Sequence, residues 1–436
     1  MALPGVKTVL KDRFYSISRQ DTPVGPRIVV IGKRNTANGT GNVADLDVVQ
    51  IVNEADAITA FGDSSHLHRA FVELVSGGAD RIYMVPLPAG SSIIAGGVST
   101  QADIKAADGT TSIFDDAFNA AEAAQPDMIV MWGRGGHPYD WDYTDVLNTG
   151  SATPDSNTSN TDFGFYADDT TTVLKSMAYR VAQAVKVINE NTHPCYAVMG
   201  VKPYVNALAT NEVMTPGQVA THLALTNLPS SAGSSVLAEV GRFVTVIATE
   251  LQSAGYPAAW GYANGACAYA AALSRMASYV SPVNKVVFNI AKLRYNASRT
   301  SLTSISDKSI NSVILNFNRA PIFSDGLTFA SANSDFTRLS TLKIVNEAAL
   351  LVRQVCQKFI GEASTIQTRN SMETAITSAL RGMQQLGALL DSDFTISYVA
   401  AENRAIIDLV LTPAFELKTI DVSISISLGA GAGTGA

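Results

Sequence analysis

The chain has 436 residues, which is enough for two or three domains that each bury a core. Its formal net charge is −7 and its 31 basic residues are scattered, which argues against nucleic acid as the main partner, because a DNA-binding surface needs clustered Lys and Arg. The apolar stretches are shorter than the ~20 residues of a membrane span, and the opening sequence lacks the apolar core of a signal peptide, so we expect a soluble protein without stable membrane insertion.

Residues 1–22 predict an N-terminal strand arm. The segment 6–19 is rich in the β-favouring residues Val, Thr, Phe, Tyr and Ile, and it stands between the breakers Pro4-Gly5 and Thr22-Pro23. The positions that we assign to this arm as contact residues are Val6, Thr8, Tyr15 and Ile17.

Residues 23–281 predict an α/β domain with a mostly parallel sheet. A short buried strand at 28–31 is followed by a helix at 66–78 and a strand at 81–87. The same order of helix and strand recurs at 115–124 and 127–133, at 172–190 and 194–202, and at 234–255 and 257–262. The segment 133–172 is rich in Gly, Asn and Asp, which indicates an exposed polar insertion.

Residues 282–412 predict a second, α+β domain. Strands are expected first, at 285–290 and 312–320. Two long amphipathic helices follow, one over 335–362 and one that begins at Asn370 with a capping-box-like Asn-x-x-Glu. The alternation of Phe394, Ile396 and Tyr398 and the apolar run at 405–412 then predict two more strands.

Residues 413–436 predict a C-terminal strand arm that ends in a flexible Gly/Ala tail. Apolar residues occupy every second place from Ile420, and the earlier pair is in the opposite phase, which predicts a bend at Lys418-Thr419. The contact positions that we assign to this arm are Phe415, Leu417, Ile420, Val422, Ile424 and Ile426. A terminal strand must satisfy its backbone groups in a sheet, either that of its own subunit or that of a neighbour.

The sequence shows only weak chemical signals. The loop 32–41 superficially resembles a phosphate cradle but matches neither of the glycine-rich phosphate-binding patterns. His66 and His68 are two apart on a helix, where side chains diverge, and the acidic loop at 140–145 lacks the spacing of a calcium-binding EF-hand. Three cysteines lie far apart and are expected to be small, semi-buried apolar residues. We therefore predict no catalytic residue, no cofactor and no metal.

The order of these features resembles the contractile tail sheath family, which spans phage tails, type VI secretion sheaths and related injection devices. The segments that carry the resemblance are PGVKTV at 4–9, GYPAAWGYANGACAYAAALSRM at 255–276, the helical stretch 335–389, and AIIDLVLTPAFELKTIDVSISI at 405–426. The family usually carries a Trp-Gly-x-Arg-Thr element before the first long helix. Its counterpart here is Gly326-Leu327-Thr328-Phe329, without the Trp and the Arg.

The resemblance implies a non-enzymatic, structural subunit of the virion tail, assembled in the host cytoplasm. Such a subunit polymerises helically around a tail tube protein and contacts baseplate and tail terminator proteins. The C-terminal domain is then the sheath core, and the terminal arms extend sheets in neighbouring subunits. Two other readings remain: a nucleotide- or sugar-binding α/β enzyme, or another shell or tube protein of a virion.

Overall fold

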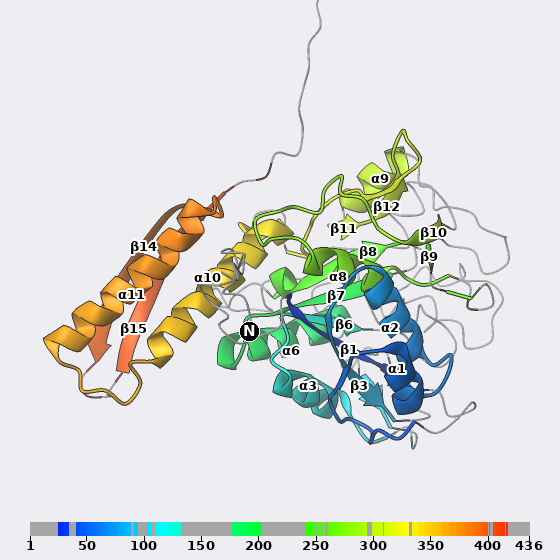
Figure 1. Cartoon of the computed structure of the whole chain (residues 1–436), viewed down its shortest axis with the longest axis horizontal. Coiled ribbons are helices and arrows are strands. Elements are labelled where there is room, and N and C mark those ends of the chain that lie inside the picture. The colour runs from blue at the N-terminus through cyan, green and yellow to red at the C-terminus, as the bar shows by residue number, and fades with distance from the viewer. Residues whose placement is uncertain are drawn as a thin grey trace, which may run out of the picture.

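The chain folds into a broad body and a narrower lobe that projects from it (Figure 1). The computed structural model describes residues 25–34, 41–88, 91–94, 103–106, 108, 110–131, 177–201, 240–249, 251–254, 256–257, 260, 262–293, 299–307, 309–330, 334–399, 401, 404–414 and 416.

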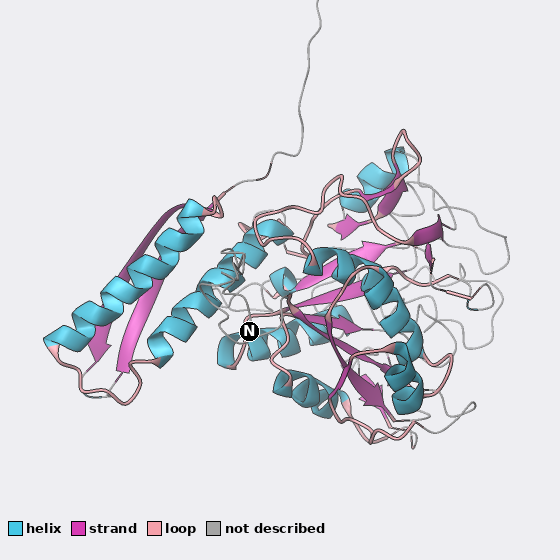
Figure 2. Ribbon diagram, in the orientation of Figure 1, coloured by secondary structure: helices cyan, strands magenta, loops and turns pink. Residues whose placement is uncertain are grey.

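A seven-stranded sheet forms the centre of the body (Figure 2). Its strands, in spatial order, are β11 (Ile310–Asn311), β8 (Val244–Ala248), β7 (Tyr196–Val201), β6 (Met128–Met131), β1 (Arg27–Lys33), β3 (Arg81–Leu87) and β2 (Val49–Ile51). Only the pair β2 and β3 is antiparallel, whereas the other neighbours pair in parallel. The sheet confirms the predicted α/β class.

Helices cover both faces of this sheet, so its strands are buried on both sides. The helices on one face are α1 (Glu54–Phe61), α2 (His66–Ser76) and α8 (Ala266–Ser274), and those on the other are α3 (Phe114–Ala123) and α6 (Met177–Asn191). Along β1, Ile28 and Val30 join the core under α2, while Val29 and Ile31 join the opposite core, as the two-residue period of a strand requires.

Short elements complete the body. Two-stranded antiparallel sheets are formed by β4 (Ser92–Ile94) with β5 (Asp103–Lys105), by β9 (Leu251–Ser253) with β10 (Ile290–Leu293), and by β12 (Val313–Leu315) with β13 (Pro321–Phe323). Helix α9 (Arg299–Ser306) contacts β11, and the 3-10 turn η2 (Gly241–Phe243) leads into β8.

The helix predicted over 234–255 is wrong in its described part. The elements from Gly241 onward are η2, β8 and β9. The prediction was wrong because β8 is buried at every position, and such a run does not separate a strand from a helix. The strand expected at 257–262 does not form at its described residues, Pro257, Trp260 and Tyr262.

The predicted elements of the second domain need three corrections. In the segment 285–290 only Ile290 belongs to a strand, although Val286 forms an isolated antiparallel bridge with Ile322. Of 312–320, only the part in β12 is extended, since a turn follows. The second long helix begins at Ile366 and not at Asn370, because the Thr365 hydroxyl accepts a hydrogen bond from the Thr368 N–H at 3.2 Å and forms the cap.

The lobe has its own core, which belongs to neither face of the central sheet. Its elements are α10 (Leu339–Gln357), α11 (Ile366–Gln385), β14 (Leu389–Val399) and β15 (Arg404–Pro413). These confirm the two predicted long helices and the two strands after them. Strand β11 lies beyond residue 281 yet pairs with β8, so the central sheet includes residues from both sides of the predicted domain boundary. The division into two domains at 281/282 stays a prediction.

The counterpart of the Trp-Gly-x-Arg-Thr element is a buried structural junction. The side chain of Asn311 donates to the Leu327 carbonyl at 2.9 Å and accepts from the Leu327 N–H at 2.8 Å. Thr245 also donates to that carbonyl at 2.8 Å. These bonds tie the segment before α10 to β8 and β11, so the lobe starts from a fixed point on the body.

A buried carboxyl group links α2 to α8. Glu73 is 1% exposed; it accepts hydrogen bonds from the Tyr256 hydroxyl at 2.8 Å and from the Ala268 N–H at 3.0 Å. Ala268 lies in the first turn of α8, whose N-cap residue, Gly265, offers no side chain, so Glu73 supplies an acceptor there. Burial raises the pKa of Glu73 to about 7, although both hydrogen bonds oppose the rise.

The folded chain should therefore lose stability as the pH rises from the ordinary carboxyl pKa of 4.5 to about 7. Over this window the folded state holds a proton that the unfolded state has released, and full ionisation costs roughly 3 kcal/mol of unfolding free energy. Glu73→Gln should remove this part of the pH dependence, because an amide bonds to the same partners without ionising. Denaturant unfolding of both proteins between pH 4.5 and 8 measures the difference, which should grow with pH in favour of the variant. Parallel profiles would show that Glu73 ionises at its ordinary pKa.

Candidate assembly interface

The lobe presents a two-stranded hairpin on top of two helices. Strands β14 and β15 pair antiparallel along their length, with Phe394 opposite Leu409 and Ile396 opposite Ile407. These four side chains face the helices and pack on the core of the lobe, where Ile376 and Leu380 of α11 are buried. The alternation that predicted β14 therefore marks the face that packs on the helices.

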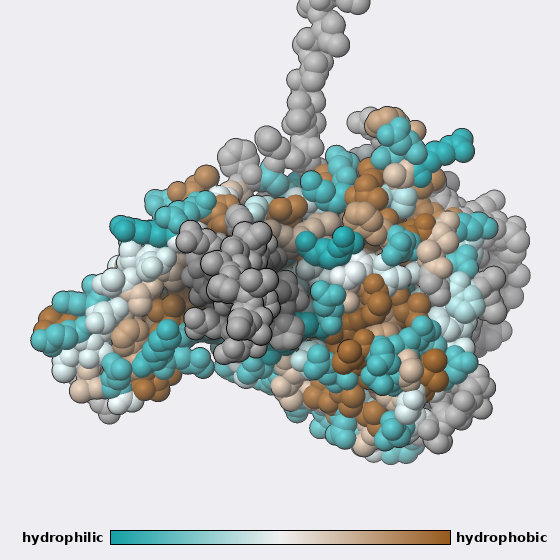
Figure 3. Space-filling model, viewed as in Figure 1, coloured by the Kyte–Doolittle hydropathy of each residue, from teal (hydrophilic) through white to brown (hydrophobic). Residues whose placement is uncertain are grey.

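The other face of the hairpin is open to solvent. Asp393, Thr395 and Ser397 of β14 are exposed, and so are Asp408 and Val410 of β15. Val410 keeps 67% of its surface exposed although its side chain is apolar. Figure 3 views the lobe from the side of α11 and shows apolar residues among polar ones at its outer end. The hairpin is thus only half covered by its own subunit.

Both outer edges of the hairpin lack a strand partner within the described residues, where β14 and β15 form a sheet of two strands. An isolated two-stranded hairpin is of marginal stability, and an unpaired edge is a template for another strand. Helices α10 and α11 stabilise one face of the hairpin but do not pair with its edges. The lobe therefore offers backbone donors and acceptors to extended segments on either side.

The predicted contact residues of both arms lie outside the described residues. They are Val6, Thr8, Tyr15 and Ile17 at the N-terminus and Phe415, Leu417, Ile420, Val422, Ile424 and Ile426 at the C-terminus. The polar insertion at 133–172 is outside them as well. The described chain places the roots of both arms: Gly25 precedes β1, and Glu416 follows β15. The role of the arm residues stays a prediction.

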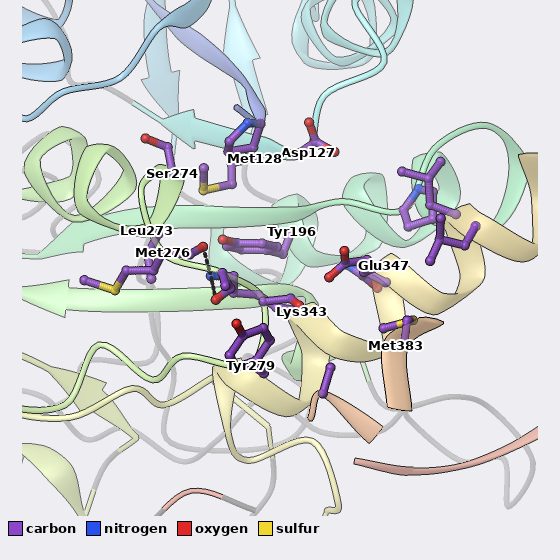
Figure 4. Close-up of a pocket in the computed structure, with 18 of the residues that line it drawn as sticks. Asp127, Met128, Tyr196, Leu273, Ser274, Met276, Tyr279, Lys343, Glu347 and Met383 are labelled. Atoms are coloured by element: carbon purple, nitrogen blue, oxygen red, sulfur yellow. Dashed lines mark hydrogen bonds between the residues drawn. The ribbon is translucent and has the colours of Figure 1, made fainter. Parts of the chain in front are cut away.

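A cavity of about 410 Å³ lies where the lobe meets the body, and it bears on the enzyme alternative (Figure 4). Its walls include Asp127 and Tyr196 at the amino ends of β6 and β7, and Lys343 and Glu347 of α10. In parallel α/β sheets, ligands bind beyond the carboxyl ends of the strands, so this cavity is at the opposite edge from the usual site. Its position does not support a nucleotide- or sugar-binding enzyme.

Lys343 is the cation of this cavity, and its hydrogen bonds indicate a structural role. Its ammonium group donates to the carbonyls of Met276 and Ala277, both at 3.2 Å, just beyond the end of α8, where Figure 4 shows it between Tyr196 and Tyr279. A cation there complements the negative end of the helix dipole. Desolvation lowers the pKa of Lys343 to about 8, and Glu347 opposes this shift. The sequence held no signal for this site, because the carbonyls it binds are remote in the chain.

The weak chemical signals of the sequence prove to be structural where the chain is described. The element after β1 is strand β2 and not a helix, so the loop 32–41 does not lead into a helix N-terminus that could bind phosphate. His68 is 2% exposed; its Nδ1 accepts from the Ser64 N–H at 3.0 Å, and its ring packs edge-on against Trp260.

No metal site or membrane span is found in the described part of the chain. There, no three His, Cys, Asp or Glu side chains gather closely enough to hold an ion. No helix among these residues has the length and apolar character needed to cross a bilayer. Cys195 and Cys267 are free and buried and Cys356 is free and half-buried, which confirms that they are small packed residues.

Comparison with solved structures identifies the fold. The chain is similar to the helical sheath of the anti-feeding prophage in its contracted state, with 13% identity, a TM-score of 0.57, and coverage of 98% of this chain and 100% of the other. It is also similar to the contracted sheath of the extracellular contractile injection system PVC, at 11% identity, a TM-score of 0.57 and 98% of each chain. A sheath tail protein from Listeria innocua matches at 10% identity and a TM-score of 0.54, over 90% of this chain and 93% of its own. No family model and no curated protein matches the sequence.

Proposed function

We propose that this chain, which has the fold of contractile sheath proteins, is the structural subunit of such a sheath. The proposal is carried by one observation: the similarity covers nearly the whole of this chain and of the sheath proteins, including both the body and the projecting lobe. If the two proteins shared only an α/β body, the similarity would cover only part of each chain.

The hairpin of β14 and β15 gives the proposal a physical basis. It has two open edges in the described chain, and the sequence has one strand-like segment at each end, 1–22 and 413–436. A strand added to each edge would make four strands from two and would satisfy the edge groups by main-chain hydrogen bonds. When each subunit gives its arms to neighbours, the contact is heterologous and generates an open helical polymer.

Contraction in such a polymer needs no catalysis. Subunits would assemble in a metastable extended lattice around a tail tube and then rotate as rigid bodies into a lower-energy packing. A difference of a few kcal/mol per subunit, summed over many subunits, would drive the tube through a cell envelope. The strand arms keep the lattice connected while the bodies repack.

The partners that follow are further copies of this chain, a tube protein inside the sheath, and baseplate and terminator proteins at its ends. Two of the similar solved structures are baseplates of the anti-feeding prophage, one of them in the contracted state, which supports contact with the baseplate. The subunit would be made in the host cytoplasm and reside in the tail of the particle.

Electron microscopy of the purified protein tests the proposal. Negatively stained preparations should show tubes or long helical particles, and light scattering should report a mass far above that of a 46.0 kDa subunit. A small, uniform oligomer that binds nucleotides or sugars would instead support the enzyme alternative. A closed shell or a narrow solid tube would support another virion protein.

A further inference from the structure

Glu416 follows the hairpin in the chain, and its side chain is bound by residues of its own subunit. Its Oε2 accepts a hydrogen bond from the Ser340 hydroxyl at 3.0 Å, and its Oε1 lies 3.2 Å from the Arg338 guanidinium. The side chain is 11% exposed. The Ala414 N–H donates to the Ala388 carbonyl at 3.0 Å and keeps the chain beside the start of β14 up to this point.

Arg338 connects this carboxylate to the body. It forms a second ion pair with Asp325 at 2.7 Å, and the Asp325 side chain is 2% exposed. A backbone bridge between Leu327 and Arg338 and a hydrogen bond from the Leu339 N–H to the Gly326 carbonyl at 2.9 Å fix the segment that carries the guanidinium. One arginine thus stands between an acid of the body and the acid at the root of the C-terminal arm.

The N-terminus of α10 lacks an acidic residue of its own, and Glu416 supplies one. Arg338, at the N-cap position, makes no side-chain capping bond, and the first turn of the helix contains no acidic residue. The positive end of a helix dipole is stabilised by an acid in the first turn, and exposed backbone N–H groups gather there. Glu416 brings the missing negative charge from 76 residues further along the chain, where it meets Ser340 in that turn.

We propose that Arg338 and Ser340 form the anchor of the C-terminal arm, with Glu416 as the residue that they hold. The inference rests on the proposed function, because an arm that joins neighbours needs a fixed root. The part of the arm that reaches a neighbour then begins at Leu417, and the anchor sets the direction in which it leaves. Tension on the arm would be passed to α10 and, through Asp325, to the body.

Trypsin provides a direct test in the isolated subunit, since Lys418 is two residues beyond Glu416. Glu416→Gln removes the charge, and Arg338→Met leaves two carboxylates without their cation. Both should increase the rate of cleavage after Lys418 by roughly tenfold, because charged hydrogen bonds hold the segment closed. Glu362→Gln, the same change at an exposed site in the loop between α10 and α11, should leave the rate unchanged.

Cleavage after Arg404, the first residue of β15, serves as the reference for unfolding of the lobe. If the variants expose Lys418 and Arg404 together, the lobe has opened, and the anchor is not supported. Equal cleavage after Lys418 in the unmodified protein and in both variants would overturn the anchor. Failure of the unmodified protein to form polymers, with Lys418 still protected, would reject the proposed function and leave the anchor in place.

Discussion

Deletion of residues 417–436 is expected to leave a folded subunit that no longer forms polymers. The truncated chain keeps both hairpin strands and Glu416, so its own core and the ion pair with Arg338 remain. It loses the whole alternating segment that would pair with the hairpin of a neighbour. Size-exclusion chromatography with light scattering should report a monomer whose thermal unfolding matches that of the full chain at a dilution where the full chain is also monomeric.

Deletion of residues 429–436 is the matched control. It removes only the Gly/Ala tail, which has no apolar side chain larger than alanine, and leaves the alternation up to Leu428 intact. Polymers should form as with the full chain. If the longer deletion also polymerises normally, the C-terminal arm is not a tether between subunits.

The second large effect is expected from the phase of the last strand. Ile424 belongs to the apolar set that would be buried on a neighbour, and Ser423 belongs to the polar set between. Ile424→Asp would bury a carboxylate at a cost of several kcal/mol and should abolish polymerisation, whereas Ser423→Asp should be much milder. Both variants introduce the same charge at adjacent positions, so they differ in the face of the strand on which the charge lies.

Thermal unfolding of the Ile424→Asp monomer identifies where the strand docks. An arm that binds a neighbour adds nothing to the stability of an isolated subunit, so the melting temperature should equal that of the unmodified chain diluted until it is monomeric. A large drop would mean that the strand folds back onto its own subunit. In that case the hypothesis that the C-terminal arm docks on a neighbouring subunit would be wrong.

The sequence predicted those elements in which one period dominates. The alternation of Phe394, Ile396 and Tyr398 placed β14, and the 3–4 spacing of apolar residues placed α10 and α11. Helix α2 begins at the first residue of the helix predicted at 66–78, where the Ser65 hydroxyl accepts from the His68 N–H at 3.1 Å. In each of these the local pattern and the tertiary burial agree.

Prediction failed at one strand that is buried on both faces, β8, and at contacts between residues that are remote in the chain. The run that forms β8 is buried at every position and does not alternate between apolar and polar residues, so its pattern does not distinguish a buried strand from a helix. The proposed anchor joins Arg338 and Ser340 to Glu416, which lies 76 residues beyond Ser340 in the chain. No spacing rule links them, and only the fold brings them together.

The position of β1 has a mechanical consequence for a lattice joined by arms. Gly25 lies two residues before this strand, which pairs through seven residues with β3 on one side and through four with β6 on the other. A pull along the strand axis from residues before Gly25 would load these ladder hydrogen bonds in shear, so that many must break together. Loading at a sheet edge would instead peel bonds away one at a time. A tether that began before Gly25 would thus be rooted in a central strand that resists extension through bonds loaded in shear.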